Sequence, residues 1–255
     1  AQQGKLLYRQ GHDYESIAVL YRTNAQSRVI EDELRHLGIP YRIYGGMSFY
    51  QRKEIKDAIA YFRLAVNSHD NEAFIRVINY PLRGIGETTV MKVREASRMS
   101  GLSMMEVIVN PESAKLDVSS ATMKKLTAFC ELIQGFGERV ATTDAYEFAT
   151  MMLRDTGVLR EAKSDTTPEG VARLENLEEM LSGIHEFVEQ RMRDGISFTP
   201  MTEFLSEVSL LTDQDENQDD TQARITLLTV HAAKGLEFKV TFIVGLEENL
   251  FPSQF

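Results

Sequence analysis

The segment RITLLTVHAAKGLEFKVTFIVG, residues 224–245, contains two apolar runs joined by a short polar turn. The runs at 224–230 and 238–245 are rich in β-branched residues and are bounded by polar residues or glycine. This pattern predicts two buried parallel strands with a short crossover between them. Because ligands gather at the carboxyl ends of parallel strands, the turn at 231–237 is expected to form a ligand site.

Four residues of this turn suit a phosphate-containing ligand: His231, Lys234, Gly235 and Glu237. Gly235 lets the backbone approach a ligand closely, and Lys234 offers a point charge to a phosphate. Glu237 can accept a hydrogen bond from a ribose hydroxyl or from water held near a metal. A polar turn with a solvated lysine and a capping glutamate explains the same residues, so spacing alone leaves both interpretations open.

The N-terminal part repeats the alternation of strand and helix. Residues 17–21 (IAVLY) form an apolar run, and residues 27–37 carry apolar side chains at helical spacing. Gly38 ends this helix, and residues 41–44 (YRIY) form a short strand candidate. This order is typical of a parallel α/β sheet. The strands near residue 225 are expected to pair with this unit, because two strands alone leave their edges unsatisfied.

Helical periodicity fills the sequence between these parts, from Lys53 to Leu211. Thr199 and Pro200 predict one helix start, with threonine as N-cap and proline at the first helical position. We therefore expect a discontinuous α/β domain, formed by residues 1–49 and 221–255 and interrupted by a large all-α inserted domain at residues 50–220. Such insertions are tolerated where two chain ends lie close together on a surface.

The charges are distributed unevenly along the 255 residues, whose net charge is −10. Half of this excess comes from an acidic cluster that is typical of a solvated, mobile linker, namely Asp213, Asp215, Glu216, Asp219 and Asp220. Residues 35–63 are net basic and suit a phosphate-facing surface. Overall charge therefore does not exclude a nucleic-acid partner.

Other features exclude several classes of protein. No apolar run approaches the roughly 18 residues of a membrane span, and no signal region is present, so we expect a cytoplasmic protein without a membrane partner. Cys130, the single cysteine, lies in an apolar helical pattern and is expected to pack in a core. The histidines are too far apart to predict a metal site. A start without Met and an end just after a strand-like run indicate a fragment.

A second segment that suits phosphate binding is RTNAQSR, residues 22–28. It follows the first apolar run and opens a helix, so backbone N–H groups, Arg22 and the Asn24 amide suit a phosphate or a strand of nucleic acid. Helix capping by Asn24 or Ser27 is equally consistent with the sequence.

A third segment is the turn Gly84-Ile85-Gly86, which connects two helical stretches. Its consecutive backbone N–H groups and the start of the next helix, with Thr88 and Thr89, suit a DNA phosphate without reading the base sequence. A tight turn with a buried Ile85 is the alternative interpretation.

Together these segments resemble the UvrD/Rep/PcrA family of superfamily 1 DNA helicases, PcrA-type members in particular. The resemblance is carried by IAVLYRTNAQSR (17–28), by YGGMSFY (44–50) with EIKD (54–57), and by TVHAAKGLEF (229–238), which matches helicase motif V nearly letter for letter. The turn at 84–86 is similar to the duplex-gripping loop of the accessory domain called 2B. The resemblance spans essentially the whole chain.

The resemblance implies an ATP-driven motor that moves 3′ to 5′ along single-stranded DNA and opens the duplex, in DNA repair and replication. Residues 1–49 and 221–255 would then belong to RecA-like domain 2A, and residues 50–220 to domain 2B. Its nucleotide-binding residues would be Lys234, Gly235 and Glu237, its single-strand contacts Arg22, Asn24 and His231, and its duplex contacts Gly84, Ile85, Gly86, Thr88 and Thr89.

The sequence departs from the family in what it lacks. It contains no Gly-x-x-x-x-Gly-Lys-Ser/Thr loop, no acidic Mg²⁺-binding motif and no later transition-state arginine, so ATP and Mg²⁺ would be bound mainly by other segments. We expect no ATP hydrolysis by the chain alone. The expected partners are the helicase segments that carry the Walker motifs, single-stranded DNA, single-strand/duplex junctions, and repair or replication proteins. A non-enzymatic DNA-binding or protein-docking module is the alternative, and a helicase-like nuclease subunit is a weaker one.

Overall fold

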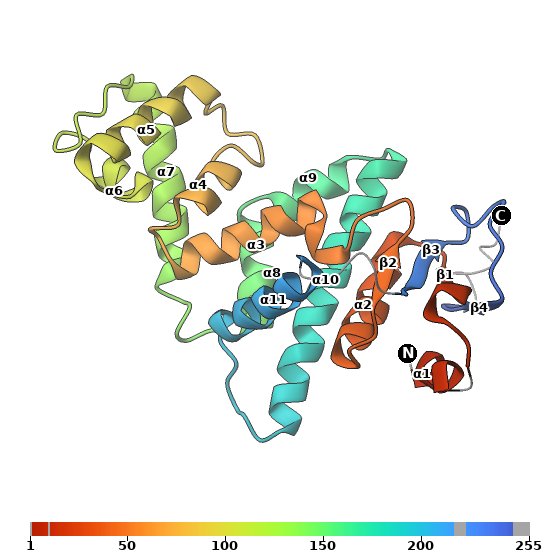
Figure 1. Ribbon diagram of the computed structural model, residues 1–255. Coiled ribbons are helices and arrows are strands. Elements are labelled where there is room, and N and C mark those ends of the chain that lie inside the picture. The colour runs from red at the N-terminus through yellow and green to blue at the C-terminus, as the bar shows by residue number, and fades with distance from the viewer. Residues whose placement is uncertain (1, 10, 217–222, 247–255) are drawn as a thin grey trace. The chain divides into compact units, whose positions relative to one another are not determined.

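The computed structural model describes residues 2–9, 11–216 and 223–246 (Figure 1). The chain divides into two compact units. Unit 1 comprises Ala1–Ile55 and Val208–Phe255, and unit 2 comprises Lys56–Glu207. The domain assignment with boundaries at residues 49 and 221 stays a prediction.

Unit 1 contains a parallel sheet of four strands: β1 (Ile17–Tyr21), β2 (Tyr41–Ile43), β3 (Ile225–Thr229) and β4 (Val240–Ile243). Their order in the sheet is β2-β3-β1-β4, so β3 lies between two strands from the N-terminal part of the chain. Ala18 pairs with Thr226 in the register of β1 and β3, and Ile17 pairs with Val240 in that of β1 and β4. The predicted α/β class and the predicted pairing of distant strands are confirmed.

The two C-terminal strands differ in burial. Ile225, Leu227 and Leu228 of β3 are buried because β1 and β2 flank this strand. In β4, at the end of the sheet, Thr241 and Ile243 are exposed and the residues between are half-buried. The prediction of two buried strands is therefore wrong for β4.

Helix α2 (Ser27–His36) covers part of the sheet of unit 1. Leu34 packs with a core formed by loop residue Ile39 and by strand residues, namely Ile17, Tyr21, Tyr41, Ile225 and Leu227. The helix ends as predicted at Gly38, whose φ of +65° is a left-handed conformation that favours glycine. Shorter elements complete this unit: α1 (Gln2–Arg9), η1 (Tyr14–Ser16), η2 (Asn24–Gln26) and η3 (Phe49–Gln51).

Unit 2 is helical over its described residues. Its helices are α3 (Lys53–Val66), α4 (Asn71–Val77), α5 (Glu87–Ser100), α6 (Met104–Val109), α7 (Ser120–Gly137), α8 (Ala145–Asp155), α9 (Val158–Ser164), α10 (Pro168–Arg193) and α11 (Met201–Glu216), of which α3 and α11 extend into unit 1. Cys130 on α7 is buried, as predicted, beside Met105 on α6.

Two predictions in the helical part are wrong. Helix α11 begins at Met201, and the hydroxyl of Thr199 is buried without a hydrogen-bond partner instead of capping the helix. The Thr199 backbone carbonyl accepts a bond from the Ala145 amide (2.8 Å), which draws this residue into the interior. A second Thr-Pro pair, Thr167-Pro168, does begin a helix in this way. The Thr167 hydroxyl accepts a bond from the Gly170 amide (3.1 Å) at the start of α10.

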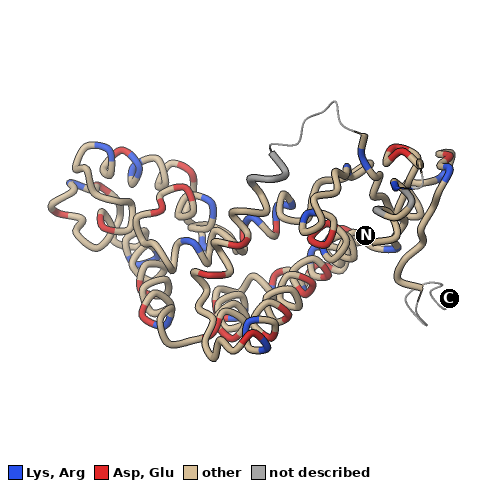
Figure 2. The backbone as a smooth tube through the Cα atoms, turned by 60° about the horizontal axis from the view of Figure 1, so that its bottom comes forward, with Lys and Arg blue, Asp and Glu red and all other residues tan. Residues whose placement is uncertain are grey.

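The second wrong prediction is that the acidic cluster forms a linker. Asp213, Asp215 and Glu216 belong to the last turns of α11 and not to a linker, while Asp219 and Asp220 lie outside the described residues. Basic and acidic residues are interspersed along the backbone of unit 2 (Figure 2). In the part of the chain that the structure describes, every helix is too short or too polar to cross a membrane.

Candidate functional site

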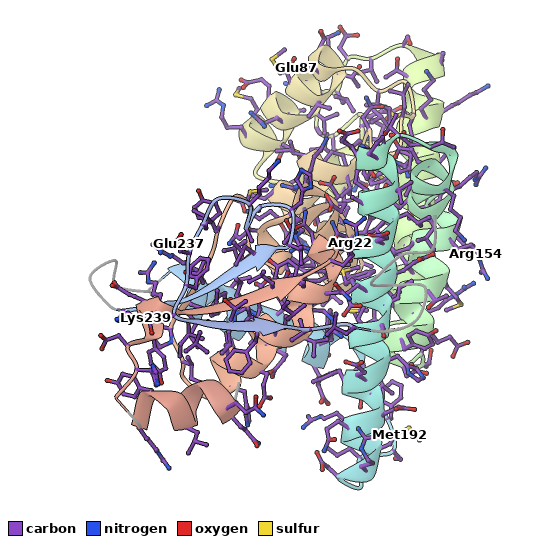
Figure 3. The ribbon with its side chains drawn as sticks, turned by 90° about the vertical axis from the view of Figure 1, so that its right-hand side faces the viewer. Arg22, Glu87, Arg154, Met192, Glu237 and Lys239 are labelled. Atoms are coloured by element: carbon purple, nitrogen blue, oxygen red, sulfur yellow. The ribbon has the colours of Figure 1, made fainter. Side chains whose placement is uncertain are left out.

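The carboxyl edge of the sheet in unit 1 brings together two of the segments singled out in the sequence. Tyr21 at the end of β1 is paired with Thr229 at the end of β3, and the Val230 amide donates to the Tyr21 carbonyl (2.9 Å). Arg22 and His231 follow these paired residues, so the segment at 22–26 and the turn at 230–235 leave adjacent strands at the same edge. Figure 3 labels Arg22 beyond β1 and Glu237 on the connection to β4.

The turn after β3 is held by its own backbone. Thr229 anchors it, because its hydroxyl accepts a bond from the Ala232 amide (3.1 Å) and its carbonyl from the Ala233 amide (3.1 Å). Gly235 has a φ of +86°, and a Cβ added there would meet nothing within 4 Å, so glycine is required by conformation and not by crowding. The turn is thus held by hydrogen bonds to Thr229 and is not a helix start.

The predicted side chains of this turn point into solvent. His231, Lys234 and Glu237 are exposed. Within the described ranges, Lys234 and Glu237 have no hydrogen bond or ion pair to another side chain, and Glu237 caps no helix. The turn therefore leaves a cation and a carboxylate available to a ligand at the edge where the strands end.

The segment after β1 is ordered by a residue that the sequence did not single out. The side-chain oxygen of Gln26 accepts bonds from the backbone amides of Arg22 (2.9 Å) and Thr23 (3.1 Å). The expected caps are absent: Asn24 is exposed, and the Ser27 hydroxyl donates instead to Glu31 (2.6 Å). Arg22 is exposed at the edge of the sheet.

Glu31 is a second residue that sequence reasoning missed. Its carboxylate is fully buried and accepts bonds from the Ser27 hydroxyl (2.6 Å), the Arg35 guanidinium (3.0 Å) and the Phe49 amide (3.1 Å). The Arg52 guanidinium donates to the same Ser27 hydroxyl (2.6 Å). Glu31 thereby ties α2 to the segment 44–52. Its one sequence signal is the four-residue spacing to Arg35.

These contacts alter the interpretation of the basic run at 35–63. Arg35 and Arg52 are buried at Glu31, so neither contributes to a phosphate-facing surface. The neighbouring Tyr21 is also buried, and burial raises the pKa of its phenol to about 12, which keeps it neutral. Arg42 and Lys53 of this run stay exposed, so burial reduces the exposed positive charge of the run without removing it.

The turn Gly84-Ile85-Gly86 in unit 2 lies between α4 and α5. Ile85 is buried, and the Asn79 side-chain oxygen accepts bonds from the amides of Arg83 (3.0 Å) and Ile85 (3.1 Å). The Lys125 ammonium on α7 donates to the Gly84 carbonyl (3.1 Å). Ile85 packs into the interior, while Gly84 and Gly86 on either side of it are exposed. The turn is therefore tightly packed and still presents its backbone to solvent.

Arg83 anchors this turn to the interior of unit 2. Its guanidinium donates to the carbonyls of Tyr80 (2.9 Å) and Thr156 (3.2 Å) and lies over the ring of Phe129. Thr88 is exposed in the first turn of α5, and Thr89 is half-buried with its amide bonded to the Gly86 carbonyl (3.0 Å). Of the predicted duplex contacts, the Ile85 side chain is therefore not accessible, and the roles of the two glycines, Thr88 and Thr89 stay predictions.

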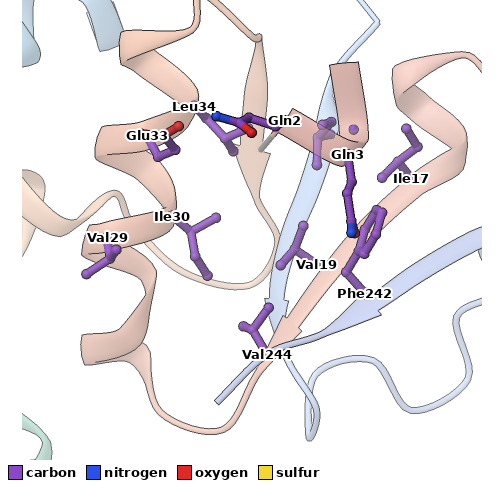
Figure 4. A pocket seen from close by; sticks show the side chains of 12 residues that line it. Gln2, Gln3, Ile17, Val19, Val29, Ile30, Glu33, Leu34, Phe242 and Val244 are labelled. Atoms are coloured by element: carbon purple, nitrogen blue, oxygen red, sulfur yellow. The ribbon is translucent and has the colours of Figure 1, made fainter. Parts of the chain in front are cut away.

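A hollow of about 450 Å³ lies on a face of the sheet in unit 1 (Figure 4). It is lined by apolar residues of β1, β4 and α2, with Gln2, Gln3 and Glu33 at its polar positions. None of the residues predicted to bind nucleotide or DNA lines it. Among the described residues, no group of three or more His, Cys, Asp or Glu is placed to hold a metal ion.

The fold and site define a parallel α/β protein whose phosphate-suited turns meet at the carboxyl edge of its sheet. The whole chain, residues 1–255, matches the model of the UvrD-like helicase C-terminal domain, and it belongs to this family. The resemblance to the UvrD/Rep/PcrA helicases is confirmed.

Curated relatives agree with this assignment. The chain is 41% identical over 240 residues to the ATP-dependent DNA helicase PcrA of Leuconostoc citreum. The aligned region covers 94% of the chain and 32% of that protein. It is 40% identical over 238 residues to DNA helicase II of Salmonella typhimurium, an alignment that covers 93% of the chain and 32% of that protein. It is 37% identical over 249 residues to the ATP-dependent DNA helicase PcrA of Staphylococcus aureus, an alignment that covers 96% of the chain and 32% of that protein. The chain therefore spans about a third of the length of these relatives.

Proposed function

We propose that the chain is part of an ATP-dependent DNA helicase that moves 3′ to 5′ along single-stranded DNA and unwinds duplex DNA in repair and replication. The observation that carries this proposal is the meeting of the segments at 22–26 and 230–235 on one edge of the sheet. The names of the relatives, ATP-dependent DNA helicase PcrA and DNA helicase II, support it.

In this proposal the sheet belongs to a discontinuous RecA-like domain 2A, and the helices between its strands form the inserted domain 2B. The pairing of β1 with both β3 and β4 supports the discontinuity, because the residues of a separate compact unit, Lys56–Glu207, lie between these strands in the sequence. The helical composition of residues 56–207 supports the assignment of the insert.

The residue roles follow from exposure and chemistry. Lys234, Gly235 and Glu237 face ATP, with the lysine near phosphate and the glutamate at a ribose hydroxyl. Arg22, Asn24 and His231 contact the backbone of the single strand. One turn then carries groups for both ligands, so a change in nucleotide state acts on the DNA contact through a single rigid connection.

The β- and γ-phosphates of ATP and its Mg²⁺ would be held mainly by Walker motifs that this sequence does not contain. The proposal therefore expects no ATP hydrolysis by residues 1–255 alone. Measurable hydrolysis by this chain, with DNA present, would contradict the expected division of labour between segments.

The nucleotide role is tested by Glu237→Gln in the complete protein. We expect DNA-stimulated ATP hydrolysis to fall about 10-fold or more, because an uncharged amide is a weaker acceptor for a ribose hydroxyl, while DNA affinity changes little. Glu33→Gln, an exposed residue on α2, is the matched control. Unchanged turnover in Glu237→Gln would remove this residue from the nucleotide site.

The duplex role is tested by Gly86→Val, since Gly86 has an ordinary φ of −77° and no atom within 4 Å of an added Cβ. The side chain should block close approach of a phosphate and weaken binding to a single-strand/duplex junction, with single-strand binding nearly intact. Gly135→Val on α7, where an added Cβ also meets nothing, is the control. Equal weakening of both DNA substrates would mark the turn as structural.

A non-enzymatic DNA-binding or docking module is the alternative. It predicts that the complete reading frame contains no Walker loop and that DNA binding is independent of ATP. Finding a Walker loop in that reading frame, together with ATP hydrolysis, decides for the helicase.

A further inference from the structure

The side-chain amide of Gln26 makes contacts on both of its sides. Its oxygen accepts bonds from the backbone amides of Arg22 (2.9 Å) and Thr23 (3.1 Å). Two N–H donors require the oxygen on that side, so the orientation of the amide is set by chemistry. The amide nitrogen therefore faces away from β1, toward the residues that follow β4.

The residue on that far side is Gly245, which directly follows the edge strand β4 and Val244. Its φ is +70°, and a Cβ added there would overlap the amide nitrogen of Gln26. The Val244 amide donates to the Leu20 carbonyl (3.0 Å), which places this segment beside the end of β1. Gly245 thus leaves the space that the Gln26 side chain occupies.

We propose that Gln26 is a positioning residue that couples the Arg22–Asn24 segment to the segment after β4, residues 244–246, through contact with Gly245. A displacement of the segment after β4 moves the Gln26 amide, and the amide carries the backbone of Arg22 and Thr23 with it. This inference rests on the proposed DNA contact of Arg22 and Asn24 for its functional consequence. The coupling itself rests only on the hydrogen bonds and the packing at Gly245.

The coupling predicts how two substitutions combine. Gln26→Ala removes both bonds to the segment after β1. Gly245→Ala inserts a methyl group where the Gln26 nitrogen lies, and the easiest relief is rotation of the Gln26 side chain, which breaks the same bonds. Each variant of the complete protein should raise the single-stranded DNA concentration for half-maximal ATP hydrolysis by roughly three- to tenfold, as the loss of one or two hydrogen bonds would.

The double variant is the decisive measurement. Once Gln26 is truncated, Gly245→Ala has no side chain to displace, so the double variant should resemble Gln26→Ala alone. Amide hydrogen exchange at Arg22 and Thr23 should quicken in both single variants and no further in the double. Independent sites would instead give effects that multiply.

Two controls separate positioning from general damage. Gly38→Ala places alanine at a φ of +65° with nothing near its Cβ, so it matches the backbone strain of Gly245→Ala without the displacement. Gln190→Ala removes an amide that bonds Asp194 and Arg193 in unit 2. Both controls should leave the DNA dependence and the exchange at Arg22 unchanged, with maximal turnover near that of the unsubstituted protein.

The outcomes distinguish the two proposals. Multiplying effects, or unchanged exchange at Arg22 and Thr23 in Gln26→Ala, would overturn the coupling even if the protein is an active helicase. Coupled exchange in a complete protein that neither binds DNA nor hydrolyses ATP would leave the positioning by Gln26 intact and sink the helicase function.

Discussion

At the scale of single residues, polar side chains that bond the backbone organise both units, and Glu31 is the fully buried one among them. Gln26 acts locally through its oxygen, which accepts bonds from the amides of Arg22 and Thr23 just before it. Glu31 joins separate pieces of backbone, because it accepts a bond from the distant Phe49 amide. Arg83 has the same role in unit 2, where one guanidinium satisfies several loop carbonyls. Sequence reasoning did not single out these residues. The Phe49 amide at Glu31 and the Thr156 carbonyl at Arg83 lie too far along the chain to be identified from local spacing.

Glu31→Ala should be among the most destabilising substitutions in unit 1. It leaves the buried Arg35 and Arg52 guanidinium groups without their shared carboxylate, and breaking a buried pair in this way costs about 3–5 kcal/mol. Urea denaturation of the chain measures the loss in free energy of unfolding. Glu33→Ala, two residues along the same helix and exposed, should change it by less than about 0.5 kcal/mol. Similar values for both variants would contradict the central position of Glu31.

At the scale of elements, helix starts show how local signals are realised or overridden. Ser103 and Glu106 form a reciprocal capping box at α6: the Ser103 amide donates to the Glu106 carboxylate (2.7 Å), and the Glu106 amide donates to the Ser103 hydroxyl (3.3 Å). Thr199 had an equally good local signal, but a backbone bond to Ala145 took precedence. A good local cap signal can therefore go unused where the residue bonds a distant segment.

The capping box should make the stability of unit 2 depend on pH. The bond from the Ser103 amide holds the pKa of the Glu106 carboxyl below its usual value. A depressed pKa in the folded state stabilises the fold above the usual glutamate pKa, and this contribution is lost as pH falls through that value toward the depressed one. Glu106→Gln cannot titrate, so its free energy of unfolding should fall less between pH 6 and pH 3.

This comparison is made in a His69→Gln background, because the His69 imidazole lies 3.4 Å from the Glu106 carboxylate and would add its own contribution to the difference. The other titrating carboxylates are common to both proteins and cancel in the difference. If the free energies of unfolding of the two proteins changed in parallel with pH, the Glu106 carboxylate would make no pH-dependent contribution to stability.

At the scale of the whole molecule, the chain consists of two units with separate cores. Leu227 is fully buried in the sheet of unit 1, and Leu126 is fully buried among the helices of unit 2. Because each unit has its own apolar interior, they are expected to respond separately to damage, as multi-unit chains commonly do.

Leu227→Ala should cost about 2–5 kcal/mol and speed amide exchange in β1 and β3, with little change in α7. Leu126→Ala should have the opposite pattern, with faster exchange in α7 and unchanged protection in β1 and β3. Mass-spectrometric hydrogen exchange on both variants measures this directly. If either substitution loosened both units equally, the molecule would be a single cooperative unit.

Most of the fold was open to prediction from particular residues. The apolar runs at 17–21 and 225–229, the glycine at 38 and the periodicity of α7 and α10 are local signals, and each element formed where they indicated. The candidate turns were located equally well, because strand ends and glycine turns are visible in sequence. Gln26 escaped notice, since its oxygen serves the backbone before it and its nitrogen meets a glycine near the other end of the chain.

Sequence alone established the α/β class, the family resemblance and the polar turns that suit phosphate, because strand and helix periods and glycine conformations depend on neighbouring residues. The fold in three dimensions settled the rest: β3 between β1 and β2, β4 at an exposed edge, Arg35 and Arg52 buried on Glu31, and Gln26 against Gly245. These features depend on which distant segments share a surface. Burial and hydrogen bonding between such segments leave no periodic trace in the sequence.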